Sequence, residues 1–209
     1  MLQNVASSLG MTYKCPVQEL EFSLDCRRIC QTCGKGSRKR EDFTNLSLDL
    51  CAETTTDKLL ENYLKPTQLE YNCTCKGQVS TMSAMFSTLP NILVLHLKRY
   101  RYTRDYRLEK VHDGMSIDKA LVLSTENTAA RFSLVGVISH LGDNAKSGHY
   151  IFEGRRPDHD LNNQGDGWLC YNDSQVFKSS RSDVCKNRQR SAYILFYQRT
   201  CGTKSTDRK

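Results

Sequence analysis

The chain has 209 residues, and its 30 basic and 23 acidic side chains give it a formal net charge of +7. This length allows one sizeable core or two small ones. The first residues lack the basic start and apolar stretch of a secretory signal, and no apolar run approaches the roughly 20 residues needed to cross a bilayer. We therefore expect a protein of the cytosol or nucleus, without a membrane segment.

The positive charge is concentrated in two runs, over 98–110 and 181–190, and in a polar tail. A basic surface admits an acidic partner such as nucleic acid. Charge runs are more often solvated faces, however, and a polar terminus is more often mobile. We therefore rank nucleic acid behind other partners and expect the basic runs to face solvent.

Two strands and one helix are predicted in the first half of the chain. Short apolar blocks over 22–24 and 43–50 flank a turn-rich segment over 30–40. In the second block leucines alternate with polar residues, which is the period of a strand with one buried face. Residues 54–64 then place their apolar side chains on one face of a helix, and Pro66 ends it.

The second half is rich in strands. Leu93, Leu95 and Leu97 occupy one face of a central strand over 91–100. Three further buried strands are predicted, over 132–141, 150–152 and 191–197. Loops rich in glycine, asparagine and aspartate separate them, notably at 142–148 and 157–167. This pattern predicts an antiparallel sheet with active loops at one end.

Ten cysteines are a high count for a chain without an export signal, and inside the cell they are better read as metal ligands, core residues or nucleophiles than as disulfides. Cys30 and Cys33, followed by Gly34, have the spacing of a zinc knuckle. Cys73 and Cys75 are one residue too close for a second knuckle. In extended backbone their thiols point to opposite faces, so both reach one metal only through a distorted turn.

The cysteine pattern leaves two interpretations open. One is a structural tetrahedral zinc site held by both pairs, and the other is an apo or partly degenerate knuckle. Cys26 is a candidate to replace a lost ligand. Either role is structural, since the pattern implies no open coordination position. No cofactor for catalysis is predicted.

Four of the five histidines have the surroundings of packed or loop residues: His96, His112, His140 and His159. His149 differs, because a flexible loop ending in Gly148 delivers it to the start of an apolar strand. Downstream, a second strand from Trp168 ends in Asn172 and Asp173. If the two strands pair as a hairpin, one of these side chains can hold one imidazole nitrogen and leave the other to take a proton, as in a catalytic triad.

Several motifs occur together in one order along the chain. They are the cysteine knuckle, Glu70-Tyr-Asn-Cys73, Leu89-Pro90, Leu95-His-Leu-Lys-Arg-Tyr100, Gly148-His-Tyr150, Trp168, Tyr171-Asn-Asp-Ser174 and Ala192-Tyr-Ile-Leu-Phe-Tyr197. In this ordered set the chain resembles the ubiquitin-specific protease family, the ubiquitin carboxyl-terminal hydrolases of peptidase class C19. The segments 137–140 and 190–193 most resemble its hydrolase 37 subgroup.

The resemblance implies an α+β fold, the papain-like cysteine protease hand with β-rich fingers and an antiparallel-sheet palm, here lacking most of the thumb. Carried onto this chain, 1–20 is a remnant of the connection from thumb to fingers and 21–88 forms the fingers with a zinc ribbon. The palm with the catalytic histidine covers 89–199, and a disordered tail follows over 200–209.

The resemblance also implies site roles. His149 matches the catalytic base, Asn172 the residue that orients it, and Asp173 an adjacent residue that shares this work. Gly142, Ser147, Gly148 and Tyr150 match the channel for the C-terminal tail of ubiquitin. Tyr150 and Trp168 are expected to pack and hold the base in place. Ubiquitin and ubiquitinated proteins are the implied partners.

One departure from the family pattern is clear. The family nucleophile lies in an N-terminal cysteine box on a thumb helix, whereas Cys15 precedes Pro16 and stands beside the fingers. We therefore expect a deubiquitinase domain without its nucleophile, inactive alone on isopeptide bonds after the terminal glycine of ubiquitin. A non-catalytic ubiquitin-binding module is the alternative, and a zinc-ribbon nucleic-acid binder is a distant third.

Overall fold

The computed structural model describes residues 15–144, 147–156 and 166–200. An eight-stranded sheet dominates the fold, with the strand order β15-β14-β13-β12-β16-β7-β3 and with β11 paired to β12 beside this path. Its strands are β3 (Leu46–Asp49), β7 (Ile92–Lys98), β11 (Ala120–Ser124), β12 (Ala129–Leu141), β13 (His149–Arg155), β14 (Trp168–Asn172), β15 (Gln175–Lys178) and β16 (Ala192–Arg199). All pairs are antiparallel except β3 with β7. We call this the palm sheet.

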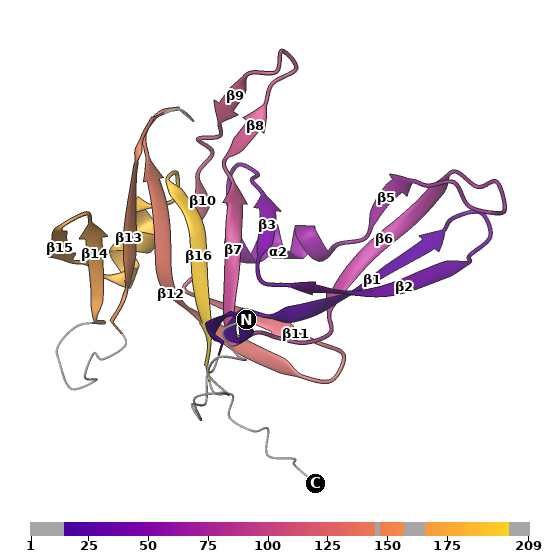
Figure 1. The fold of residues 1–209 in the computed structure, drawn as a ribbon, viewed down its shortest axis with the longest axis horizontal. Helices are drawn as coiled ribbons and strands as arrows, with labels where there is room; N and C mark the ends of the chain where they lie inside the picture. Colours follow the sequence, from indigo (N-terminus) through magenta and orange to yellow (C-terminus); the bar gives the residue numbers. More distant parts are fainter. Residues whose placement is uncertain (1–14, 145–146, 157–165, 201–209) are drawn as a thin grey trace, which may run out of the picture.

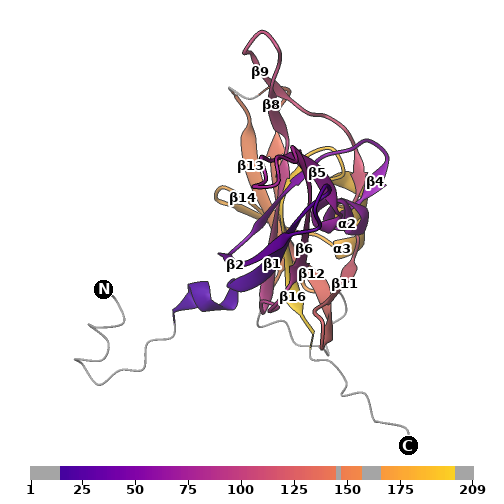
Figure 2. The same ribbon diagram turned by 90° about the vertical axis from the view of Figure 1, so that its right-hand side faces the viewer.

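A four-stranded antiparallel sheet extends from the palm sheet as an arm, in the order β2-β1-β6-β5 (Figure 1). Its strands are β1 (Phe22–Cys30), β2 (Gly36–Phe43), β5 (Thr67–Glu70) and β6 (Val79–Phe86). Two small pairs complete the strands: β4 (Thr54–Thr55) with β10 (Met115–Ser116), and β8 (Tyr100–Tyr102) with β9 (Leu108–Lys110). The β8–β9 hairpin projects beyond the end of the palm sheet (Figures 1 and 2).

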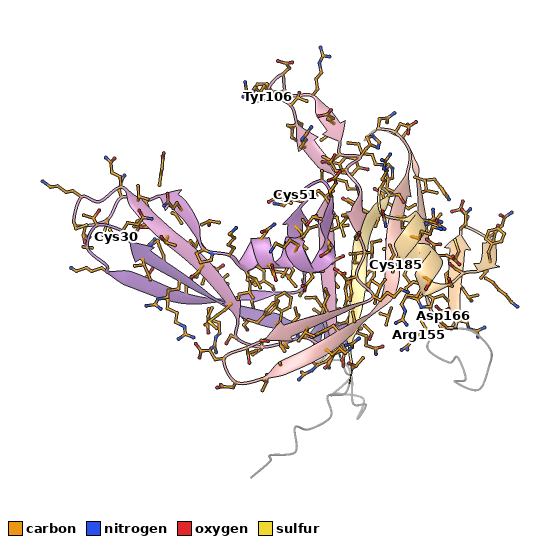
Figure 3. All side chains as sticks on the ribbon, turned by 180° about the vertical axis from the view of Figure 1, so that it is seen from behind. Cys30, Cys51, Tyr106, Arg155, Asp166 and Cys185 are labelled. Carbon is orange, nitrogen blue, oxygen red and sulfur yellow. The ribbon has the colours of Figure 1, made fainter. Side chains whose placement is uncertain are left out.

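The helices are few and short. They are the 3₁₀ turn η1 (Pro16–Glu19), α2 (Thr56–Leu64) and α3 (Arg181–Asn187). The Thr55 hydroxyl accepts a hydrogen bond from the Lys58 amide and caps α2, which ends before Pro66. Leu59 and Leu60 of this helix are buried in the core. α3 lies behind the palm sheet in Figure 1 and in front of it in Figure 3, where Cys185 is labelled.

The core follows the alternation of the sequence. In β7 the leucines 93, 95 and 97 are fully buried, while Ile92, Val94 and His96 on the other face are only partly covered. Leu46 and Leu48 of β3 are buried beside them. The predicted strands at 43–50, 91–100, 132–141, 150–152 and 191–197 are therefore present, and the predicted α+β fold is confirmed. Among the described residues, no helix is long and apolar enough to cross a membrane.

The expectation of a turn-rich segment over 30–40 was wrong. This segment contains most of β2, whose charged side chains hide the strand pattern. Asp25 on β1 accepts hydrogen bonds from Arg38 and Arg40, so these charges are used within the arm.

The basic run over 98–110 is also not simply a solvated face. Arg99 is completely buried and Lys110 almost so. Arg99 donates hydrogen bonds to the carbonyls of Ala192, Val111, Asp113 and Gln189. These two cations are structural, because backbone carbonyl groups replace the water that each loses on burial. The predicted tail from residue 201 onward lies outside the described residues, as does His159.

Candidate functional site

A hairpin of neighbouring strands brings His149 and Asn172 together. β13 begins at His149 and β14 ends at Asn172, and the two strands pair antiparallel with Phe152 opposite Tyr171. The start of one strand therefore lies beside the end of the other. β12 supports β13 from the other side, with Leu141 opposite His149. The structure thus forms the hairpin on which the sequence argument depended.

The imidazole of His149 is hydrogen bonded to the side-chain amide of Asn172. His149 Nε2 and Asn172 Oδ1 are 2.5 Å apart. Because an amide oxygen can only accept, Nε2 carries the hydrogen and the neutral ring keeps the Nδ1 lone pair for an incoming proton. The imidazole is part-buried, with 43% of its side chain exposed. This arrangement can act as an oriented general base.

Asp173 stands one residue further along, in the two-residue turn between β14 and β15. Its Oδ2 atom is 4.0 Å from His149 Nε2, and its side chain is 81% exposed. A carboxylate at this distance in water stabilises an imidazolium weakly. Asp173 has a left-handed φ of 51°. The geometry therefore places Asn172 first and Asp173 second as partners of His149.

The loop before His149 is closed tightly at its base. Gly142 has a φ of 148°, and a side chain there would lie 2.8 Å from the Cα of Gly148 and from the carbonyl oxygen of Ser147. Ser147 in turn bonds to the Asn144 side chain through its amide and hydroxyl. Lys110 donates from Nζ to the carbonyl groups of His140 and Gly142. The predicted channel residues therefore lie at one end of the palm sheet, at the foot of this loop.

Aromatic rings line the same end of the sheet. Tyr150 contacts the rings of His140 at 4.7 Å and Tyr193 at 6.0 Å, and Tyr100 contacts Tyr193 at 5.8 Å. The expected packing role holds for Trp168, which is buried. Tyr150 differs, because it is 51% exposed and so offers one face to a ligand. His140, expected to have a structural role, is buried within the group.

Within the described part of the chain, no cysteine is hydrogen bonded to His149. Cys170 lies on β14, two residues before Asn172, but it pairs with Glu153 in the register of the hairpin. Burial, with the charge of Glu153, raises the pKa of its thiol. A thiol with a raised pKa is a poor nucleophile at neutral pH. Among the described residues, the hydrogen-bond partner of His149 is therefore Asn172 and not a thiol.

The two cysteine pairs meet at the tip of the arm. The four sulfur atoms of Cys30, Cys33, Cys73 and Cys75 all lie within 4.8 Å of one another. Cys30 and Cys75 are 3.7 Å apart, and Cys33 and Cys73 are 3.8 Å apart. Four thiolates at about 2.3 Å from a tetrahedral zinc would be separated by about 3.8 Å. The residues therefore fit a structural zinc ion, and Cys26, in the middle of β1, is not in the group.

Two turns bring these sulfur atoms together. Gly34 adopts a left-handed φ of 71° after the first pair, and its amide bonds to the Cys30 carbonyl. After the second pair Lys76 has a φ of 68° and its amide bonds to the Cys73 carbonyl. This is the distorted turn that the shorter spacing requires. The amide of Gly77 then donates to the Cys75 sulfur at 3.4 Å.

The pKa values of two thiols in this group, those of Cys30 and Cys75, shift in opposite directions. The backbone amides of Cys33 and Thr32 lower the pKa of Cys30 to about 6. The Gly77 amide acts in the same direction on Cys75, but burial and the neighbouring cysteines outweigh it and raise its pKa to about 12. Opposite shifts in one group are expected when one thiolate disfavours the next. A bound zinc ion would remove this conflict by holding all four as thiolates.

Sequence reasoning missed Arg99, Tyr100 and Lys110 as parts of this end of the palm. Their signal was present in the basic run over 98–110, but a run of like charge does not show which members turn inward. His140, expected from the sequence to be a packed or loop residue, lies against Tyr100 and Tyr150 at the same end of the palm.

Fold and site together define a class of protein: a palm sheet with a β-rich arm and, at one end of the sheet, a histidine oriented by an asparagine. The particular family follows from a family model, Ubiquitin carboxyl-terminal hydrolase, which matches residues 5–197. The chain belongs to the ubiquitin carboxyl-terminal hydrolase family. The match begins inside the segment that we assigned to the connection between thumb and fingers.

Curated relatives carry the same name. Ubiquitin carboxyl-terminal hydrolase 37 of Canis lupus familiaris is 37% identical over 139 residues, which is 61% of this chain and 14% of the relative. Ubiquitin carboxyl-terminal hydrolase 9 of Saccharomyces cerevisiae is 29% identical over 203 residues, 88% of this chain and 26% of the relative. The chain thus spans between a seventh and about a quarter of these relatives. The predicted resemblance to hydrolase 37 is confirmed.

Solved structures share the fold. A yeast SAGA DUBm with an Sgf73 mutant superposes with a TM-score of 0.79 at 25% identity, covering 97% of this chain and 46% of that one. A SAGA DUB module of Ubp8, Sgf11, Sus1 and Sgf73 bound to monoubiquitin gives a TM-score of 0.76 at 28% identity, covering 91% and 43%. The predicted fold of fingers and palm is therefore confirmed.

Proposed function

We propose that this chain is the fingers and palm portion of a deubiquitinase catalytic domain, in which His149 is the general base and Asn172 orients it. The observation that carries the proposal is the hydrogen bond of 2.5 Å between His149 Nε2 and Asn172 Oδ1. It leaves Nδ1 as the proton acceptor. Family membership supports the reaction class, because the relatives are ubiquitin carboxyl-terminal hydrolases.

In the proposed mechanism Nδ1 of His149 takes the proton of a cysteine thiol. The thiolate attacks the carbonyl carbon of the terminal glycine of ubiquitin, and the imidazolium returns its proton to the departing amine. Water then hydrolyses the thioester with His149 again as base, which releases the ubiquitin carboxylate and the free thiol. Asn172 keeps the ring in one tautomer throughout, and Asp173 favours the imidazolium from the edge of the site.

The thiol of this mechanism has no counterpart beside His149 in the described ranges. We therefore propose that the chain is inactive alone and that it works with a nucleophile supplied by another segment. The four cysteines of the arm do not fill this role, since their spacing fits a structural zinc ion. When bound, that ion would fix the tips of the two hairpins to each other.

We also propose ubiquitin as the partner, because a structural relative was solved bound to monoubiquitin. Gly142, Ser147, Gly148 and Tyr150 would form the channel for its tail, with the open face of Tyr150 as one wall. A second candidate, a non-catalytic ubiquitin-binding module, is favoured by one observation: no described thiol is hydrogen bonded to His149.

The test is an NMR titration of ¹⁵N-labelled ubiquitin with the chain. We expect the signals of the C-terminal tail to shift, and ubiquitin without its last two glycines to bind more weakly. Tyr150→Ala should reduce the tail shifts, whereas Phe177→Ala, an aromatic residue of similar exposure on β15, should not. An unchanged ubiquitin spectrum at every concentration would refute ubiquitin as the partner.

A further inference from the structure

A series of contacts leads from the buried core of the palm to the backbone beside His149. It begins at Arg99, whose guanidinium is fixed by four backbone carbonyl groups. Tyr100 follows Arg99 directly in the chain and begins β8. The hydroxyl of Tyr100 lies 2.9 Å from Nδ1 of His140, which is a hydrogen bond. Tyr100 therefore fixes the position of the His140 ring. Tyr100 is itself anchored in the fold through Arg99, its neighbour in the chain.

The other side of the His140 ring faces Gly148. A Cβ atom on Gly148 would lie 2.1 Å from His140 Nε2 and 2.5 Å from Cε1. Real Cβ atoms do not approach other atoms this closely, so the backbone of Gly148 rests directly on the ring. Only glycine allows this contact. His140 therefore sets how far the chain at Gly148 lies from β12.

Gly148 is joined by one peptide bond to His149, and the two strands are locked at this point. His140 pairs with Tyr150 and Leu141 pairs with His149 in the β12–β13 register. Lys110 holds the carbonyl groups of His140 and Gly142 on the other side of the loop base. Burial, and then the charge of Lys110, lower the pKa of His140. A neutral ring at physiological pH keeps an acceptor nitrogen for hydrogen bonding to Tyr100.

We propose that His140, held by Tyr100, is a positioning residue that fixes His149 at hydrogen-bonding distance from Asn172. The inference rests on the proposed function, since it takes His149 to be the base. His140 itself does not meet the substrate or the reacting atoms. It acts through the backbone at Gly148, where a movement of a fraction of an ångström changes the distance between His149 Nε2 and Asn172 Oδ1.

The ring nitrogens of His149 report this placement directly. In the native chain the bond to Asn172 favours one neutral tautomer, so the two ¹⁵N signals of the ring should lie far apart. If His140→Ala releases Gly148, both tautomers become populated and the two signals should move toward each other. His140→Gln fills much of the same space and should restore the native pattern. Tyr100→Phe, which removes only the hydroxyl, should give a smaller shift in the same direction as His140→Ala.

Tyr193→Phe is the matched control. It also removes one hydroxyl from a ring that contacts Tyr100, at 5.8 Å, yet it leaves the bond between Tyr100 and His140 in place. It should leave both His149 signals unchanged. The double variant Tyr100→Phe with His140→Ala should match His140→Ala alone, because both changes act through one contact.

The proposal is overturned if His140→Ala folds and leaves the ring signals of His149 as in the native chain. If His140→Ala does not fold, Tyr100→Phe decides, and unchanged signals in that variant contradict the proposal equally. Failure of the proposed function would have a different result. The spectrum of labelled ubiquitin would stay unchanged, while His140→Ala would still shift the ring signals of His149.

Discussion

Arg188 donates a hydrogen bond from Nε to Oε2 of Glu153 at 2.5 Å, and this ion pair joins the residue after α3 to the inner face of β13. A second bond runs from Arg188 Nη2 to Oε1, and the Ser179 hydroxyl donates to the same oxygen. The carboxylate is nearly buried. The strand that carries His149 is therefore fixed to the only described helix that covers this part of the palm.

Removing one partner of this pair should destabilise the fold strongly. We expect Arg188→Ala to lower the free energy of unfolding by about 3–5 kcal/mol, because it leaves a buried, uncompensated carboxylate. Arg101→Ala breaks the exposed pair between Arg101 and Glu109 and should cost less than about 1 kcal/mol. Urea denaturation of both variants checks this. If both variants lose the same free energy of unfolding, the buried pair contributes no more to stability than the exposed one, which would contradict the prediction.

Arg99 should be among the least replaceable residues of the palm. Arg99→Ala leaves four carbonyl groups without their donor, so we expect a loss of at least about 3 kcal/mol of stability or failure to fold. Arg99→Lys keeps the charge but cannot reach all four acceptors, and should remain clearly destabilised. Arg107→Ala, on the projecting β8–β9 hairpin, should be neutral. Thermal unfolding of the three variants tests the ranking, and a stable Arg99→Ala would contradict it.

The arm should hold one zinc ion per chain. Elemental analysis after purification without chelator should find it, and removal with a strong chelator should lower the unfolding temperature, because metal binding contributes to folding. Cys75→Ser should lose the metal, whereas Cys51→Ser, an exposed thiol outside the group, should retain it. Affinity should fall as the pH decreases, since protons compete for the thiolates. A metal-free chain of unchanged stability would refute the site.

The buried His140 and the partly buried His96 should make the fold less stable in mild acid. Burial lowers the pKa of both His96 and His140 below the ordinary value of about 6.5. The unfolded chain then binds protons more readily than the folded one, so stability is full above about pH 6.5 and is lost as the pH falls toward the folded pKa values. His96→Gln should reduce this loss. The free energy of unfolding is measured at pH 7.5 and 5.5 in the native chain and in His96→Gln. Loss of zinc affects both proteins equally, so it cancels when their pH dependences are compared. An identical pH dependence in the variant would contradict the assignment.

The sequence allowed the central sheet to be predicted because its strands obey simple alternation. Leu93, Leu95 and Leu97 face the core as their period requires. Local pattern also placed Asn172 or Asp173 beside His149, because a hairpin of two apolar strands leaves little choice about which ends meet. The preference for Asn172 came from the family resemblance.

Other features depended on tertiary structure. β2 consists largely of charged residues and pairs at an edge, where no apolar alternation is needed. In the sequence, Arg99 and Lys110 look like surface residues. In the fold, backbone carbonyl groups of distant segments surround them. The turn at Lys76, which brings Cys73 and Cys75 to one point, needs a left-handed residue that propensity does not predict for lysine.

The central claim is that the chain carries the base of a deubiquitinase without a thiol placed to use it. Ubiquitin with a C-terminal electrophile tests this most directly, with intact mass as the measurement. We predict that the mass of the chain stays unchanged after incubation, although ubiquitin binds. A covalent adduct of one ubiquitin per chain, lost in His149→Ala, would contradict the claim and show that a nucleophile is present.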